Sequence, residues 1–491
     1  MEPVPLWTGF TYKPHQVTGI QWLKAQELKD PSGGIVCDEM GLGKTIQLVS
    51  LVKSAPRTKS LLIAPVAVLS QWEETARRSG ITVLRPAKTG YHRTWKIQGK
   101  FRPFAAKLYV IGYEAARASP QYLSIVEWTR LICDEAHRLA SRKSSLYSMA
   151  EAIKATSRWF LTATPIINSM SDLKSLLTLI GVSSPTGDIM QTVNEYTMAR
   201  FMTDLRDSGV AAPPPPVINK LVLPFHSEAE EEFYKGLTGA IVKTWKAMED
   251  EAPNATMKLK LFMRLRQLSV HPQVYIEARR KSALAVAQPR PDWVGTSTKF
   301  EAIKGLLGTT DEKPHKWIIF CHFHSEMELL KTTLEAMPQI GRVFLYNGTM
   351  GHSERKEVIS ATHEPSTGTD VLLIQLQSGG VGLNLQHFDR IVFTGPWWTS
   401  ALMEQAIGRA VRIGQAEVVQ VYHLVLKEEQ ALNIDRLMTD KADVKGSMCR
   451  EVLKNAWPAA KPEAKPQAKP QAKPAPPLPR DSKDKKEKSN T

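Results

Sequence analysis

The stretch Gly33-Gly34-Ile35-Val36-Cys37-Asp38-Glu39-Met40-Gly41-Leu42-Gly43-Lys44-Thr45 decides how the chain is interpreted. A short apolar run typical of a buried strand leads into a turn rich in glycine, and a helix-compatible run follows from Ile46 to Val52. Gly41 and Gly43 let backbone N–H groups face phosphate oxygens where a Cβ would clash, and the next helix N-terminus adds partial positive charge. The pattern therefore predicts a phosphate-binding loop.

Two side chains of this loop suit a nucleoside triphosphate with magnesium. Lys44 would reach the β- and γ-phosphates, and the Thr45 hydroxyl would ligate Mg²⁺. The usual pattern begins with a glycine five residues before Gly43, a position that is Asp38 here. The alternative is a glycine-rich turn with an incidental Lys-Thr pair, which the motifs further along the chain disfavour. The residues expected to bind the nucleotide here are Asp38, Gly41, Gly43, Lys44 and Thr45.

Composition indicates a soluble intracellular protein with a polyanionic partner. Among 491 residues, 42% are apolar, and 64 Lys and Arg exceed 49 Asp and Glu. The four cysteines are far apart without a CxxC spacing, which argues against a zinc module or a disulfide framework. The N-terminus lacks the charged and apolar regions of a signal peptide, and no run approaches membrane-spanning length. We expect no membrane partner.

Two series of alternating strands and helices predict an α/β fold with two parallel-sheet lobes. The first lobe has apolar runs at 61–64, 108–111, 131–133 and 159–161, and the second at 317–320, 342–346, 371–374, 391–393 and 418–425. Between them lies a helical region that begins with four prolines, Pro213 to Pro216, typical of a stiff connector. An Ala-Lys-Pro repeat near the C-terminus predicts disorder. The expected boundaries are 1–205, 206–290, 291–456 and 457–491.

Polar residues follow several of these strands, at the sheet edge where α/β proteins bind ligands. Asp134 could hold the magnesium ion and Glu135 could polarise an attacking water, although exposed acidic turns are common. Thr162 and Thr164 either sense the γ-phosphate or cap a turn before a proline. Gln16 could pair with an adenine edge, although its neighbourhood also suits an ordinary amphipathic helix.

In the second lobe, Gln405, Arg409 and Arg412 follow at spacings of four and three, so they would share one helix face. A row of guanidinium groups could reach an anion held by the other lobe, as an arginine finger does. The alternative is a solvated basic face.

These residues together resemble the Swi/Snf-type branch of superfamily-two ATPases, over Phe10 to about Arg436. Within it, Pro396-Trp397-Trp398 and Leu265-Arg266-Gln267 look most like the subgroup of helicase-like transcription factor, without its RING insertion. Three departures occur: Ala163 replaces a glycine, Thr399-Ser400 replaces Asn-Pro, and Gly408 replaces an acidic residue. The motifs are Gln16, DEMGLGKT (38–45), APVAVLSQW (64–72), DEAH (134–137), LTATP (161–165), LRQLSVHP (265–272), YNG (346–348) with Arg355, SGGVGLNL (378–385) and QAIGRAVRIGQ (405–415).

The resemblance implies two RecA-like lobes with helical protrusions between them, and a monomer that uses ATP and Mg²⁺ to move along double-stranded DNA. Catalysis would fall to Lys44, Asp134, Glu135, Arg409 and Arg412, with Gln405 at the nucleotide and with Thr45 and Asp134 at the metal. The residues expected to contact nucleic acid are Ser378, Gly379, Gly380, Asn384 and Trp397.

The implied roles are remodelling of chromatin or other protein–DNA complexes, or DNA repair. Nucleosomes or other DNA-bound proteins would then be partners, in the nucleus of a eukaryote or otherwise in the cytoplasm. A strand-separating DNA or RNA helicase and a non-catalytic DNA-binding scaffold are the alternatives.

Overall fold

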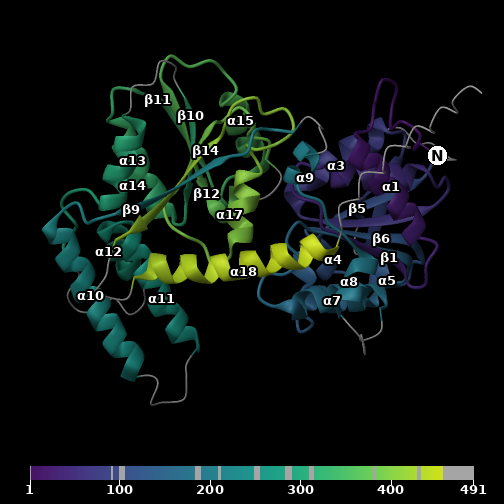
Figure 1. The fold of residues 1–491 in the computed structure, drawn as a ribbon, viewed down its shortest axis with the longest axis horizontal. Helices are drawn as coiled ribbons and strands as arrows, with labels where there is room; N and C mark the ends of the chain where they lie inside the picture. Colours follow the sequence, from purple (N-terminus) through teal and green to yellow (C-terminus); the bar gives the residue numbers. More distant parts are fainter. Residues whose placement is uncertain are drawn as a thin grey trace, which may run out of the picture. The chain divides into compact units, whose positions relative to one another are not determined.

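The computed structural model describes residues 2–89, 92–98, 105–182, 189–207, 212–247, 255–281, 290–308, 315–379, 383–427 and 433–456. They form two α/β lobes, each built on a mainly parallel sheet, which confirms the predicted fold class (Figure 1). The expected tail from Trp457 onward lies outside the described residues. Within these ranges, no helix has the length and apolarity that a membrane crossing requires, and no cluster of His, Cys, Asp or Glu is arranged to hold a metal ion.

The sheet of the first lobe has the strand order β4-β3-β5-β2-β6-β7-β1-β8. All its pairs are parallel except β3 with β4. The strands are β1 (Ser32–Val36), β2 (Lys59–Ala64), β3 (Thr82–Thr89), β4 (His92–Gln98), β5 (Lys107–Gly112), β6 (Trp128–Asp134), β7 (Ala155–Leu161) and β8 (Thr197–Met198). The helices are α1 (Pro14–Gln26), α2 (Lys44–Lys53), α3 (Val66–Arg78), α4 (Tyr113–Arg117), α5 (Gln121–Ser124), η1 (Ala136–Leu139), α6 (Ser145–Ala152), α7 (Met170–Ile180), α8 (Ile189–Tyr196) and α9 (Met202–Asp207).

Alternate residues of the central strands enter two different cores, one on each face of this sheet. In β2, Leu61 and Ile63 belong to one buried cluster, whereas Leu62 and Ala64 belong to the other. This alternation follows from the two-residue period of a strand. It also explains why the central strands read as continuous apolar runs, since both of their faces are covered.

The second lobe has the strand order β11-β12-β10-β13-β14-β9, with every pair parallel. Its strands are β9 (Val217–Leu223), β10 (Lys316–Cys321), β11 (Ile340–Tyr346), β12 (Thr369–Gln375), β13 (Arg390–Phe393) and β14 (Gln420–Leu426). Its helices, with those of the intervening region, are α10 (Glu228–Ala247), α11 (Ala255–Val270), α12 (Pro272–Arg280), α13 (Thr298–Leu307), α14 (His324–Glu335), α15 (His352–Ala361), α16 (Leu376–Gly379), α17 (Ser400–Ile407) and α18 (Ile434–Ala456).

One strand lies in a region of the chain that was expected to contain none. Residues 206–290 were expected to hold only a linker and helices, yet β9 lies there and pairs with β14 from Val217 to Leu223. The strand is at the sheet edge and much of it is exposed, so it lacks the continuous apolar run of a central strand. Its partner lies about 200 residues later in the chain, a separation that local pattern cannot indicate.

The start of α10 is tied to α13 through a carboxylate. The N–H of Glu230 donates to Oγ of Ser227, as a capping box requires. The Glu230 carboxylate, however, accepts from the N–H and the hydroxyl of Thr298. Only the Ser227 half of a capping box is therefore seen, and the Glu230 carboxylate holds α10 against α13. Leu237 and Ile241, one helical turn apart on α10, are both buried.

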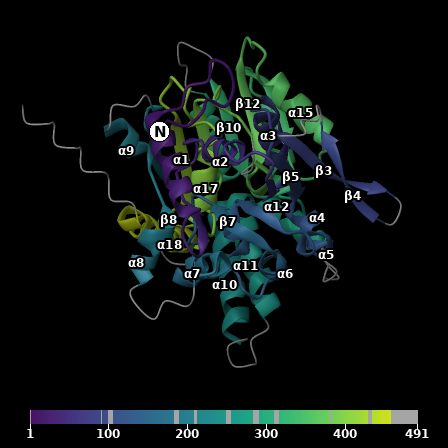
Figure 2. The ribbon, with the colours of Figure 1, turned by 90° about the vertical axis from the view of Figure 1, so that its right-hand side faces the viewer.

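The long helix α18 contacts both lobes. Near its start, Ile434 and Met438 pack on Ile241 and Leu265 of the helical region. Near its end, Cys449 and Leu453 belong to a core cluster of the first lobe. Figures 1 and 2 show the helix in yellow-green.

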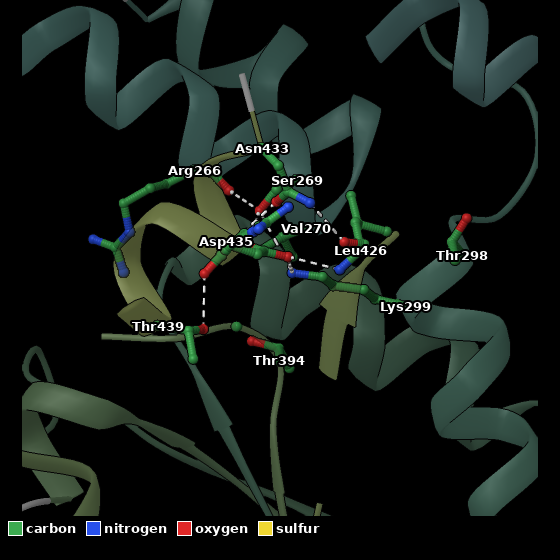
Figure 3. A network of polar contacts seen from close by, with 12 residues as sticks. Arg266, Ser269, Val270, Thr298, Lys299, Thr394, Leu426, Asn433, Asp435 and Thr439 are labelled. Carbon is green, nitrogen blue, oxygen red and sulfur yellow. Dashed lines mark hydrogen bonds and ion pairs between the residues drawn. The ribbon is translucent and has the colours of Figure 1, made fainter. Parts of the chain in front are cut away.

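A fully buried lysine fixes the beginning of α18. Lys299, on α13, is 0% exposed, and its Nζ lies 2.6 Å from Oδ2 of Asp435. Asp435 also accepts hydrogen bonds from the Ser269 hydroxyl and the N–H of Leu426 (Figure 3). A charge in such a place is tolerated only when it is paired and hydrogen-bonded. The pair therefore joins α11, α13, β14 and α18.

We expect Lys299→Met to lower the free energy of unfolding by about 3 to 5 kcal/mol, because the Asp435 carboxylate would stay buried without its cation. Lys304→Met is the matched control, since Lys304 on the same helix makes only a partly exposed ion pair with Glu301 and should cost no more than about 1 kcal/mol. Urea denaturation measures both. Equal losses in the two variants would contradict this role for the buried pair.

Candidate functional site

The glycine-rich loop lies between the end of β1 and the start of α2. Gly41 and Gly43 have φ values of 87° and 84°, which favour glycine. A Cβ on Gly43 would lie 2.5 Å from Nε2 of Gln16, so a side chain there would displace the Gln16 amide. Lys44 is the first residue of α2, and the loop therefore leads directly into a helix N-terminus. This is the geometry of a phosphate-binding loop.

Lys44 and Gln16 are both held by backbone atoms of this loop. The Lys44 ammonium donates to the carbonyl oxygens of Asp38 at 2.5 Å and Glu39 at 3.4 Å. The buried amide of Gln16 accepts from the N–H of Lys13 and donates to the carbonyl of Leu42. Both predicted nucleotide-binding side chains thus lie at the loop.

Asp38 has a different role from the one expected. Its carboxylate is 0% exposed and forms an ion pair with Arg200, with 2.9 Å between Arg200 Nε and Oδ1. Gln47 Nε2 donates to the same carboxylate at 3.0 Å, and Arg200 also donates to Gln47 and to the carbonyl of His15. The side chain therefore supports the loop from inside the lobe, and only the Asp38 backbone carbonyl reaches Lys44. Arg200 belongs to no recognised motif, so no sequence pattern indicated this ion pair.

At the end of β6, Asp134 and Glu135 lie side by side. Asp134 Oδ2 accepts from the indole N–H of Trp72 at 2.8 Å. Burial, together with the nearby Glu135 charge, raises the pKa of the Asp134 carboxyl to about 6, although the Trp72 hydrogen bond and the Lys44 charge act in the opposite direction. A carboxylate whose ionised form is disfavoured in this way suits a nearby cation. With the Thr45 hydroxyl it offers the oxygen donors that Mg²⁺ prefers.

Glu135 occupies a left-handed backbone conformation with φ of 52°. This conformation is uncommon outside glycine, and such strain often occurs at functional sites. Its carboxylate accepts from Nε2 of Gln405 at 3.0 Å. Gln405, expected to contact the nucleotide, therefore contacts the acidic residue that was expected to polarise water.

The DEAH motif (134–137) and the LTATP motif (161–165) are linked by a hydroxyl. Nδ1 of His137 lies 3.2 Å from Oγ of Thr162, and the N–H of Thr164 donates to that same oxygen. Burial lowers the pKa of His137 to about 4, with Arg138 adding to the effect, so the ring is neutral at pH 7. Thr162 is thus a buried link between the two motifs.

The expectation that Gln405, Arg409 and Arg412 share one helix is wrong. Helix α17 ends at Ile407, and both arginines lie in the turns that follow. Gly408 caps the helix, and a Cβ there would lie 3.1 Å from the Cβ of Met40 in the glycine-rich loop. This close approach accounts for glycine at a position where the resembled family has an acidic residue.

Even so, the structure brings both arginines to the first lobe. A Cβ on Gly41 would lie 3.7 Å from Cγ of Arg412, whose Nε donates to the carbonyl of Gly408. Arg409 is 3% exposed. Burial lowers its pKa to about 10, with Arg412 adding to the effect, and the Glu135 and Asp134 charges oppose it. Cations of one lobe therefore face the loop and the acidic pair of the other.

The residues expected to contact nucleic acid are less well defined. Gly380 lies outside the described residues, as does the side chain of Ser378. Asn384 is exposed. Trp397 is half-buried and stacks on His322, with ring centroids 5.4 Å apart, and the Arg266 guanidinium lies 4.5 Å from its ring. Trp397 thus has an evident packing role.

Two models of known domain families match this chain. The model of the SNF2-related domain matches residues 15–274, and that of the helicase conserved C-terminal domain matches residues 298–414. A probable global transactivator of Orgyia pseudotsugata multicapsid polyhedrosis virus is 26% identical, over 89% of this chain and 90% of the viral protein.

Other relatives are longer than this chain. A mouse SWI/SNF-related regulator of chromatin, subfamily A member 1, is 25% identical over 89% of this chain but 43% of its own length. The probable ATP-dependent DNA helicase CHR23 of Arabidopsis thaliana is 27% identical over 85% of this chain and 41% of its own length.

A solved structure, the Sulfolobus solfataricus SWI2/SNF2 ATPase core in complex with dsDNA, has 21% identity and a TM-score of 0.38, over 93% of this chain and 99% of that one. The SNF2-related model covers more than half of the residues, and the helicase C-terminal model covers most of the second lobe. The chain therefore belongs to the SNF2-related family, the Swi/Snf-type ATPases.

Proposed function

We propose that this chain is an ATP-dependent translocase on double-stranded DNA. The SNF2-related and helicase C-terminal domains make it a DNA-dependent ATPase. The observation that carries the proposal further is the 3.0 Å hydrogen bond from Gln405 to Glu135, with Arg412 beside Gly41. A site assembled from two lobes can convert a change in the bound nucleotide into a relative movement of the lobes.

The first lobe binds the nucleotide. Backbone N–H groups from Gly41 to Lys44 donate hydrogen bonds to the phosphate oxygens, and the Lys44 ammonium exchanges its contacts with loop carbonyls for phosphate oxygens. Thr45 and Asp134 would hold Mg²⁺, and the bound ion would supply positive charge to offset that of the phosphate oxygens. Gln16 lies where its amide can read the base next to the loop.

Hydrolysis requires groups from both lobes. Glu135 orients the attacking water, and its contact with Gln405 makes its position depend on the second lobe. Arg409 and Arg412 stabilise charge on the transferred phosphoryl group. The two lobes contact the same nucleotide only when they are together. Each cycle of nucleotide binding and release therefore brings the lobes together and then apart. DNA held across both lobes through its phosphates would advance with each cycle.

Remodelling of chromatin or of other protein–DNA complexes is the finer role we propose, with DNA repair as an extension. The mouse relative named as a regulator of chromatin supports the first. Such a role places the protein, which we propose acts as a monomer, in the nucleus of a eukaryotic host, and otherwise in the cytoplasm.

The test measures ATP turnover without nucleic acid and with single-stranded DNA, double-stranded DNA or RNA, together with displacement of a triplex-forming strand and with duplex unwinding. We expect the greatest stimulation by double-stranded DNA, displacement of the third strand, and no unwinding. Strand separation would instead identify a helicase, and absence of turnover under all conditions would leave only a scaffold.

Glu135→Gln should retain ATP binding and lose turnover by about 10² to 10⁴-fold, because the amide keeps its shape but no longer polarises water. Lys44→Ala is the informative comparison, since it should weaken ATP binding itself. Fluorescent-nucleotide binding and phosphate release measure the two effects. Turnover at the parent rate in Glu135→Gln would remove this residue from the mechanism.

Arg412→Ala should reduce DNA-stimulated turnover by about 10³ to 10⁵-fold at saturating ATP and DNA, the range known for arginine fingers. Arg412→Lys should fail nearly as much, because an ammonium cannot reproduce the planar guanidinium fork. DNA affinity should stay within a few-fold of the parent. A solvated basic face would give the opposite result, with turnover intact and DNA binding weakened.

A further inference from the structure

Strands β3 and β4 leave the sheet of the first lobe as a two-stranded ribbon. β3 pairs with β5 only from Thr82 to Leu84, whereas its pairing with β4 continues to Thr89. Pro86 has no N–H to donate to a further strand, as is usual at sheet edges. We call residues 85–89 and 92–96 the basic ribbon; Figure 2 shows it at the right-hand side, beyond β5.

The ribbon lies in the part of the sequence where positive charge is concentrated. Residues 75 to 113 contain nine Lys and Arg and no Asp or Glu, against a surplus of 15 for the whole chain. Basic residues gathered in one segment, without acidic neighbours in sequence, are typical of contact with a polyanion.

The strand register places like charges opposite one another, which destabilises the ribbon when no anion is bound. Arg85 lies directly opposite Lys96, and Lys88 directly opposite Arg93. Like charges in opposite positions destabilise a pair of strands. Arg85 forms an ion pair with Glu73 of α3, whereas Lys96 on the other strand is exposed. A bound anion would offset the remaining repulsion.

The base of the ribbon is held firmly by aromatic contacts. The Trp95 ring meets Tyr109 and Trp128 edge to face, with centroids 4.9 Å and 6.2 Å away. Such packing orients the two strands without help from a ligand. Because β3 runs parallel to β5, its far end extends from the same sheet edge as Asp134 and Thr162. The ribbon is therefore directed toward the functional edge of the lobe.

We propose that the basic ribbon of the first lobe binds the phosphate backbone of double-stranded DNA, as a contact in addition to those expected of Ser378, Gly379, Gly380, Asn384 and Trp397 in the second lobe. This inference rests on the proposed function insofar as that function names the duplex as the polyanion. A two-stranded ribbon has dimensions that the major groove of B-form DNA accommodates, with the phosphates along its rims. Contacts of this kind add affinity without sequence preference.

Lysine on an edge strand can also serve only to prevent aggregation. Reversal of charge separates the two explanations, since glutamate keeps the edge charged but repels phosphate. The test variant is therefore Lys88→Glu/Arg93→Glu/Lys96→Glu. Its matched control is Lys143→Glu/Lys154→Glu/Lys174→Glu, which makes the same change in net charge at exposed lysines elsewhere on the first lobe.

Binding of a fluorescent duplex is measured without ATP from low to high salt. The ribbon variant should bind at least about tenfold more weakly near 0.1 M salt, with a slope of log affinity against log salt that is shallower by roughly 2 to 3, because about three phosphate contacts are lost. DNA-stimulated turnover at saturating duplex should stay within twofold of the parent. Circular dichroism and the melting temperature confirm that both variants are folded.

Parent-like affinity and slope in the ribbon variant would overturn the inference, as would equal losses in the ribbon variant and its control. These outcomes are independent of the proposed function. If the parent binds duplex but its turnover is not stimulated, the translocase proposal fails while the ribbon is still tested. If the parent binds no duplex, both fail.

Discussion

The nucleotide-binding half of this protein depends on the neutralisation of one buried charge. The Asp38 carboxylate has no access to water, and Arg200 and Gln47 surround it. Arg200 reaches back to the carbonyl of His15, so one guanidinium joins α1, α2, the glycine-rich loop and the chain after β8. Removal of either charge would leave the other buried and unpaired, a costly state. An acidic residue where a glycine is usual is therefore a structural member of this loop.

Local chemistry made much of the site predictable, and long-range packing accounts for the rest. Left-handed glycines and the acidic pair at the end of β6 follow from short patterns whose geometry is fixed within a few residues. Asp38 and Arg200 form an ion pair although they are 162 residues apart in the sequence, and no local pattern indicates it. The end of α17 before Arg409 also escaped prediction, because the approach of Gly408 to Met40 belongs to the other lobe. The fold class was predictable since it rests on the period of apolar runs.

Near the acidic pair and the glycine-rich loop, the two lobes meet through residues with small or flexible side chains. Gly408 lets the end of α17 approach Met40, and the Gln405 amide reaches the Glu135 carboxylate. Glu135 is at the same time held in a strained backbone conformation. A change in the second lobe can thus act on the position of a single carboxylate. In this arrangement the catalytic geometry is complete only when both lobes contribute.

Helix α18 adds a mechanical restriction. Twenty-three residues of α-helix span about 35 Å, with one end fixed by the Lys299–Asp435 ion pair and the other by Cys449 and Leu453 in the first lobe's core. A helix of fixed length that is anchored at both ends allows the two lobes to rotate or to twist about it. It resists their separation, because that would require a broken helix or the extraction of apolar side chains into water. The movement of the two lobes relative to each other during ATP turnover would then be a rotation around α18, with little translation along it.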